Sequence, residues 1–292
     1  MKILKNFSQM FFFVILFGMT AQAQTEKTES SVPSEDIFLD DVVEKKLVKE
    51  NRLLPYQPIR EADIPWEMRV QRVIDTREKL NLVFKSQELN LFNALVGMVR
   101  NGDITIFSDE KFKNILTAED IDKKLSSIDT ITDFDYDTYT EVIKIVKNDI
   151  NWENIYSYRI KEIWYFDKET STMRNKILGI APIYASPKDE QNGIPPSPLF
   201  WVYYPEARES FSKQRVFNDL NDISPNTWAE VFDNRHFTSY VYKRSNVLDY
   251  RLKDFYAANP DAEKDMSGID MLLHSDKIKA ELFNIEHDLW EY

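Results

Sequence analysis

Two runs of β-forming residues in the middle of the chain constrain its fold more than any other feature. Residues 159–166 and 172–184 are rich in β-branched and aromatic side chains, and the polar stretch DKET at 167–170 separates them. This pattern predicts an antiparallel hairpin. With a four-residue loop, Trp164 is expected opposite Met173. The chain should therefore have a β-rich centre.

Further strands are predicted on either side of the hairpin. Residues 199–204 read LFWVYY and are apolar on both faces, as in a central strand that is covered on both sides or covered by a partner. Short strands are also expected over 104–107 and 237–242. The pattern over 141–147 is compatible with either helix or strand.

Helices are predicted before the β-rich part. Over residues 63–80, Asp63 can cap a helix, Pro65 fits its first turn, and four apolar residues recur at helical spacing. A second helix is expected over 88–100, where Gly102 supplies a left-handed stop.

Two shorter helices have recognisable starts. Thr117 and Asp120 resemble a capping box for a helix that runs to Leu125. Ser224 followed by Pro225 is expected to begin a short helix.

The chain ends in a predicted amphipathic helix that Ser275 and Asp276 are expected to open. Its apolar residues recur at i, i+4, i+7 and i+11, which makes a narrow seam that should pack on the domain. The seam and its extension comprise Ile278, Leu282, Ile285, Leu289 and Trp290. Together these patterns predict an α+β fold, a single mixed globular domain over residues 63–292 with flanking helices.

The first 23 residues have the pattern of a secretory signal peptide. Lys2 and Lys5 precede an apolar run at 11–19, and a small–x–small pattern ends at Ala23. Cleavage is expected between Ala23 and Gln24. The run is too short to span a bilayer, and no cysteine follows it for lipid attachment. The mature net charge would be (37 − 2) − 49 = −14.

The mature chain is expected to begin with a non-globular segment. Residues 24–36 are polar and lack periodicity, which predicts a disordered leader. Residues 37–62 carry short apolar bursts and two prolines, which predicts an extended arm that lies on its own domain or on a neighbour. The candidate contacts in this arm are Phe38, Leu39, Val42, Leu53 and Leu54.

Composition excludes several classes of function. The chain has no cysteine, so thiolate and zinc–thiolate chemistry is absent. Its six glycines are too scattered for a phosphate-binding loop. A net charge of −12 argues against nucleic-acid binding.

Catalytic and metal-binding patterns are weak. None of the three histidines has a metal-ligand spacing to another ligand. The stretch DFDYD at 133–137 copies the start of a calcium loop, but Thr138 and Lys144 occupy the positions that require Gly and Glu. We expect no catalytic, cofactor or metal residues. The residue patterns favour a binding or structural role, while a glycan- or peptidoglycan-binding protein and a hydrolase with paired carboxylates remain as alternatives.

Four blocks of the sequence resemble a known family. They are READIPWEMRVQRVIDTREKLN at 60–81, YRIKEIWYFDKETSTMRNKILGIAP at 158–182, SYVYKRSNVLDYRLKDFY at 239–256 and KIKAELFNIEHDLWEY at 277–292. With the cleavable leader, they resemble the GldN (PorN) family of gliding motility proteins. The chain departs from the expected pattern at Ile163, where an acidic residue is typical.

The resemblance implies a non-catalytic structural subunit of the type IX protein secretion and gliding motility machinery. Such a subunit is periplasmic and assembles with a GldK/PorK-like lipoprotein and with neighbouring copies into a ring at the inner face of the outer membrane. The periplasmic part of a GldM/PorM-like motor protein is a further expected partner. Trp164 and Trp201 join the arm residues as candidates for partner contact.

Overall fold

The computed structural model of the protein describes residues 53–135, 140–184, 195–219, 221, 226–257 and 268–290. The predicted cleavage site between Ala23 and Gln24 and the arm candidates Phe38, Leu39 and Val42 lie outside this part of the chain. Residues 51–292 form one compact unit.

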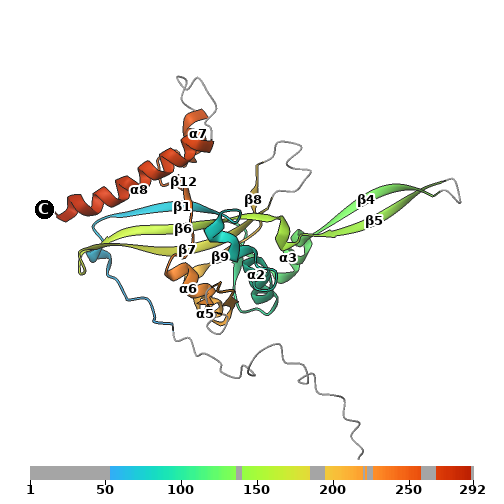
Figure 1. Ribbon diagram of the computed structural model, residues 1–292, viewed down its shortest axis with the longest axis horizontal. Coiled ribbons are helices and arrows are strands. Elements are labelled where there is room, and N and C mark those ends of the chain that lie inside the picture. The colour runs from blue at the N-terminus through green and yellow to red at the C-terminus, as the bar shows by residue number, and fades with distance from the viewer. Residues whose placement is uncertain are drawn as a thin grey trace, which may run out of the picture. The chain divides into compact units, whose positions relative to one another are not determined.

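An eight-stranded antiparallel sheet organises this unit (Figure 1). The strand order is β12-β1-β6-β7-β9-β2-β3, and β8 also pairs with β7. The strands are β1 (Glu67–Asp75), β2 (Ile106–Phe107), β3 (Ile115–Leu116), β6 (Ile155–Asp167), β7 (Thr172–Tyr184), β8 (Ser197–Pro198), β9 (Trp201–Tyr203) and β12 (Tyr240–Arg244).

Helices and two separate two-stranded sheets complete the α+β fold, which confirms the predicted class. The helices are α2 (Leu91–Arg100), α3 (Ala118–Leu125), α5 (Tyr204–Lys213), α6 (Trp228–Asp233), α7 (Leu252–Ala257) and α8 (Gly268–Trp290), with 3-10 turns η2 (Glu61–Asp63), η3 (Lys79–Lys85) and η4 (Trp152–Asn154). Strands β4 (Ser126–Asp135) and β5 (Thr140–Asp149) pair with each other, as do β10 (Arg215–Val216) and β11 (Asn226–Thr227).

The predicted central hairpin is present as β6 and β7, but its predicted register is wrong. Trp164 lies opposite Asn175, and Phe166 lies opposite Met173. The difference arises at the turn, where Asp167 stays in the ladder and its carboxylate accepts hydrogen bonds from Glu169 N and Thr170 Oγ1. The loop is therefore shifted one residue along the chain.

The predicted helix over residues 63–80 is wrong, because residues 67–75 form strand β1. This strand lies inside the sheet, between β12 and β6. Val70, Gln71, Val73 and Ile74 are all buried, so both of its faces are covered. A strand covered on both faces has no strict apolar alternation, and its apolar spacing happened to imitate a helix.

Other predicted elements are confirmed, with shifted ends. Helix α2 starts after Asn90, whose side chain accepts a hydrogen bond from Asn93 N, rather than at residue 88. Gly102 has φ +77°, as predicted for its stop. The capping box of Thr117 and Asp120 is present at α3. Residues 141–147 belong to a strand, and β9 is a covered interior strand but ends at residue 203.

Two helix starts were predicted at the wrong residues. Helix α6 begins after Thr227, which forms a capping box with Glu230, rather than at Ser224. Helix α8 begins at Gly268. Ser275 lies inside this helix, fully buried, and its Oγ accepts a hydrogen bond from Val241 N at 2.7 Å.

Two apolar clusters lie on the same face of the sheet. Residues paired across strands share a face, and alternate residues along a strand share it too. On β1 this face carries Val70 in the smaller cluster and Ile74 in the larger one. The larger cluster packs against α2, α3, α5 and α6, whereas the smaller one packs against α7 and α8.

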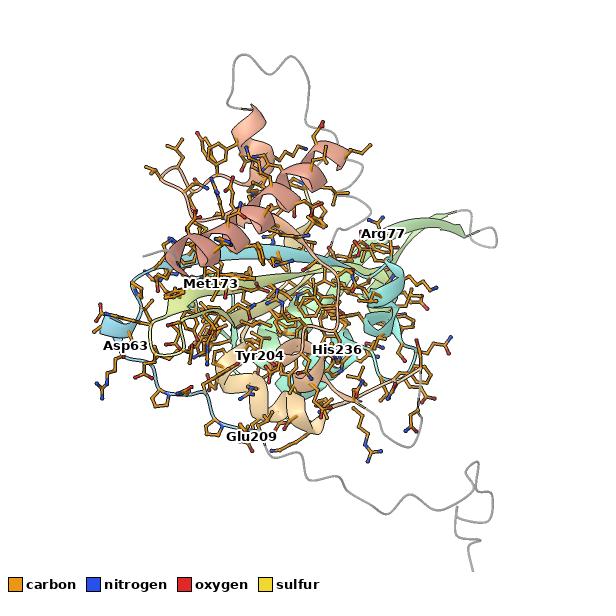
Figure 2. All side chains as sticks on the ribbon, turned by 60° about the vertical axis from the view of Figure 1, so that its left-hand side comes forward. Asp63, Arg77, Met173, Tyr204, Glu209 and His236 are labelled. Carbon is orange, nitrogen blue, oxygen red and sulfur yellow. The ribbon has the colours of Figure 1, made fainter. Side chains whose placement is uncertain are left out.

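Figure 2 shows how α5 and α8 lie against the sheet. Tyr204 at the start of α5 is fully buried, while Glu209 on the same helix lies outward. Met173 lies below α8, where its backbone N–H donates to Glu286 Oε1 at 3.1 Å. Each helix therefore presents one face to the sheet.

On the opposite face of the sheet, an aromatic ring packs directly against a glycine. Phe112, which has φ +56°, packs edge-on against Tyr203 and lies over Gly179 of β7. A Cβ at Gly179 would lie 2.6 Å from Phe112 Cζ and 3.3 Å from Trp201 Cε3. This position therefore requires glycine.

Gly179→Ala should destabilise the protein by about 1–3 kcal/mol, because the Phe112 ring must leave its place. Gly97→Ala is the matched control, since nothing lies within 4 Å of the added methyl group, and it should stabilise α2 by up to about 1 kcal/mol. Urea unfolding of both variants measures the difference. Equal stabilities would contradict the packing described for Phe112.

Leu282→Ala should lower the free energy of unfolding by about 2–5 kcal/mol, because Leu282 is 3% exposed in the smaller cluster. Phe283→Ala, at the neighbouring position, should change it little because that side chain is 70% exposed. Thermal unfolding compares the two. An unchanged midpoint for Leu282→Ala would show that the helix does not depend on this contact.

Candidate functional site

Large apolar side chains reach the surface along the C-terminal part of the chain. We call this surface the C-terminal groove. It surrounds a cavity of about 510 Å³ whose apolar lining includes Met68, Tyr250, Leu252 and Phe255. On α7, on α8 and in the loop before α7, exposed apolar residues are Val247, Leu248, Phe255, Ile269, Leu272, Leu273 and Phe283. Exposed apolar patches mark sites of protein interaction, which makes this groove a candidate.

Polar contacts hold the wall of this groove in place. Asn246 donates from its side-chain amide to the carbonyl oxygens of Arg244 and Tyr250, and its Oδ1 accepts from Tyr250 N. Arg244 Nη1 donates to Glu281 Oε2 at 2.6 Å, which joins β12 to α8. His274 also lines the cavity. The groove is thus built from a fixed loop and two packed helices.

The last residues of the predicted arm lie on the chain's own domain. The Tyr56 ring has Lys176 Nζ 4.3 Å and Arg208 Cζ 4.5 Å from its centre. Arg208 also donates to the carbonyl oxygen of Leu54 and pairs with Asp233 at 2.7 Å. Burial, with the nearby Asp233 carboxylate, raises the pKa of Tyr56 to about 12. We call this contact the arm seat.

A fully buried carboxylate lies between the two apolar clusters. Glu162 Oε1 accepts from Arg235 Nη2 at 2.8 Å, and Oε2 accepts from Trp164 Nε1 at 3.0 Å. Arg72 belongs to the same face and donates to Ser239 Oγ and O. Burial lowers the pKa of Arg72, and the Glu162 carboxylate opposes this shift.

The surroundings of the Glu162 carboxylate suit a role in holding other side chains in place rather than in acid–base chemistry. Both of its oxygens already accept a hydrogen bond, and the side chain is 0% exposed. It ties the loop after α6 to the middle of β6, at the boundary of the two clusters. Its role in the described structure is therefore to position Arg235 and Trp164.

The residues selected from the sequence are spread over the domain. Leu53 packs partly against the larger cluster, whereas Leu54 is 79% exposed. Trp164 packs against the smaller cluster, and Trp201 is 1% exposed in the interior. Their role in partner contact stays a prediction.

The predicted C-terminal seam is described as far as Ile285. Ile278 and Leu282 are buried in the smaller cluster, and Ile285 is half-buried. The side chains of Leu289 and Trp290 lie outside the described residues, as do those of the acidic stretch at 133–137. Among the side chains that are described, no group of three or more His, Asp or Glu gathers as a metal site.

Sequence reasoning missed Glu162, Arg235 and Tyr56. A signal for Glu162 was available, since Ile160, Glu162 and Trp164 alternate along β6 and a charged residue there interrupts an inward apolar row. No comparable signal marks Arg235, because its partner is 73 residues away.

Comparison with known protein families gives a match over most of the chain. The sequence model of a family described as gliding motility associated protein GldN matches residues 59–291. No curated protein sequence matches the chain.

Glu162→Gln should destabilise the protein by about 3–5 kcal/mol, because it leaves the Arg235 charge and the nearby Arg72 charge uncompensated. Glu209→Gln makes the same chemical change at an exposed pair with Lys213 and should cost at most about 1 kcal/mol. Denaturant unfolding at neutral pH compares the two variants. Equal losses would show that Glu162 contributes no more than a surface charge.

Proposed function

The chain belongs to the GldN family of gliding motility associated proteins, and from this membership we propose that it is a non-catalytic structural subunit of the type IX secretion and gliding motility machinery. The family consists of structural motility and secretion components and is not a known enzyme family. Membership implies a component of the cell-envelope motility machinery. In the described part of the chain, no helix has the length and apolar character to span a membrane.

The finer proposal is a periplasmic ring subunit held at the outer membrane by a GldK/PorK-like lipoprotein, with neighbouring copies beside it and a GldM/PorM-like motor protein as a further partner. The observation that carries it is the family match, which covers the domain that bears the C-terminal groove. A subunit of a large assembly needs surfaces that bury apolar area against other chains.

The C-terminal groove is the proposed contact with the lipoprotein. Leu272 and Leu273 are 50% and 64% exposed on α8, close to the cavity lined by His274. Apolar side chains at the centre of an interface, inside a polar rim, supply most of its affinity. Arg244 and Asn246 provide polar groups at this rim.

Leu272→Gln with Leu273→Gln should abolish co-purification of the lipoprotein from solubilised envelope and reduce secretion, because the apolar contact area is lost. Ile115→Gln is the control: it removes an apolar side chain that is 67% exposed on β3. Affinity purification of the tagged mature chain, with mass spectrometry of its partners, measures the effect.

Two results would contradict the proposal in different ways. Normal co-purification of the groove variant would show that the lipoprotein binds another surface of the protein. Absence of any lipoprotein with the wild-type chain would refute the ring-subunit role and favour an exported glycan-binding protein or hydrolase, which binding to peptidoglycan or release of soluble sugars would then separate.

A further inference from the structure

Strands β4 and β5 form a separate two-stranded sheet, which we call the ribbon. They pair over ten residues each without a register shift, and they join none of the other described strands. The base of the ribbon is fixed, because Ile150 N donates to the backbone oxygen of Leu125, a buried residue of the larger cluster, at 2.7 Å. In Figure 1 the ribbon extends from α3 away from the eight-stranded sheet. A two-stranded sheet is marginally stable in water unless it packs against something else.

One face of the ribbon is mostly apolar. Residues paired across the two strands share a face, and alternate residues along each strand share it too. On one face the register places four large apolar residues, two threonines and one charge of each sign. We call it the apolar ribbon face, and its positions are Ile128, Thr130, Thr132, Phe134, Glu141, Ile143, Ile145 and Lys147.

The two charged positions of this face lie far apart. Lys147 pairs with Ile128 near the base of the ribbon, whereas Glu141 pairs with Phe134 near its tip. Six residues along β5 separate them, which corresponds to about 20 Å, so the two charges cannot form an ion pair within one ribbon. Each of them therefore needs an opposite charge from elsewhere when the face is covered.

The apolar ribbon face is complementary to a second copy of itself. Sheets that stack face to face lie about 10 Å apart. If the second ribbon is antiparallel about a two-fold axis, with β4 over β4 and β5 over β5, each charge lies over the opposite charge and each large apolar residue over another. A parallel two-fold arrangement, with β4 over β5, places both charges over apolar residues instead. The antiparallel contacts between copies are Lys147–Glu141, Ile128–Phe134, Thr130–Thr132 and Ile145–Ile143.

The opposite face of the ribbon lacks this complementarity. Its positions include three aspartates and one lysine, namely Asp129, Asp133, Asp135 and Lys144. The same two-fold axis would place Asp129 over Asp133 of the second copy and Lys144 over Lys144. Like charges directly opposite each other are destabilising. Only the apolar ribbon face therefore suits pairing between copies.

We propose that the apolar ribbon face binds the same face of a second copy of this protein, antiparallel and about a two-fold axis. The contact rests on the register and charges of the ribbon and does not require the ring role proposed above. A two-fold contact closes after two copies, so it joins subunits in pairs. It uses none of the residues that line the C-terminal groove. With eight positions per copy, it is smaller than a standard interface of about 20–30 residues a side, so the association is weak and a covalent trap suits its measurement.

Chemical cross-linking of the purified full mature chain, without the lipoprotein, tests this proposal. The chain has no cysteine, so one introduced cysteine is the only thiol that a short bifunctional maleimide can modify. Thr132→Cys lies near the centre of the apolar ribbon face and should give covalent dimers. Ile131→Cys, the adjacent position on the opposite face, is the matched control and should give few.

Charge reversal on the Thr132→Cys background identifies the contact. Lys147→Glu alone, or Glu141→Lys alone, should lower the dimer yield about tenfold, because two like-charge contacts replace two ion pairs. A mixture of these two variants should restore the yield between unlike chains, and so should both changes in one chain. Lys144→Glu makes the same reversal on the opposite face and should leave the yield unchanged.

Three outcomes would overturn the proposal. Equal dimer yields from Thr132→Cys and Ile131→Cys would show that collisions, and not this face, bring the copies together. A yield that neither single charge reversal lowers would rule out the paired charges. If neither the mixture nor the double reversal restores a lowered yield, the charges act within one ribbon rather than between copies. The ring role is decided separately by co-purification of the lipoprotein, so either proposal can fail while the other stands.

Discussion

A fully buried carboxylate lies between the two hydrophobic clusters on one face of the sheet. Glu162 lies on the covered face of the sheet, between the cluster that holds α2, α3, α5 and α6 and the cluster that holds α7 and α8. Its hydrogen bonds to Arg235 and Trp164 fix the position of this boundary, because a buried charge is tolerated only where its hydrogen-bond partners are in place. The C-terminal helices therefore pack as a distinct layer, and the groove they form belongs to that layer.

The two faces of strand β6 have different roles. One row, Ile160, Glu162 and Trp164, builds the covered side with its ionic boundary. The other row contains Arg159 and Lys161 and gives the opposite side its positive charge. One strand thus organises the hydrophobic packing on one side of the sheet and the positive charge on the other. A family match says nothing of this division, which only the register of β6 with its neighbours reveals.

The sequence predicted those features that depend on local chemistry. The hairpin, the capping box at Thr117 and the stop at Gly102 each need only a few neighbouring residues, and they are present. Features set by distant partners were wrong or missed. The strand identity of residues 67–75 depends on pairing with β6 and β12. The hairpin register is an exception, because the hydrogen bonds that Asp167 accepts come from residues only two and three positions away. The buried ion pair joins residues of separate elements, so local spacing could indicate Glu162 but not Arg235.

The hydroxyl of Ser275 has a consequence for how copies of this protein can join. Strand β12 is an edge strand of the sheet, and a free edge can ordinarily pair with a strand from another molecule. At Val241 the outward N–H is already bonded to Ser275 Oγ of α8, so a foreign strand would have to displace the helix to continue the ladder there. Helix α8 therefore protects that edge from pairing with another strand. Pairing with a strand of another molecule is therefore disfavoured at this point of the edge.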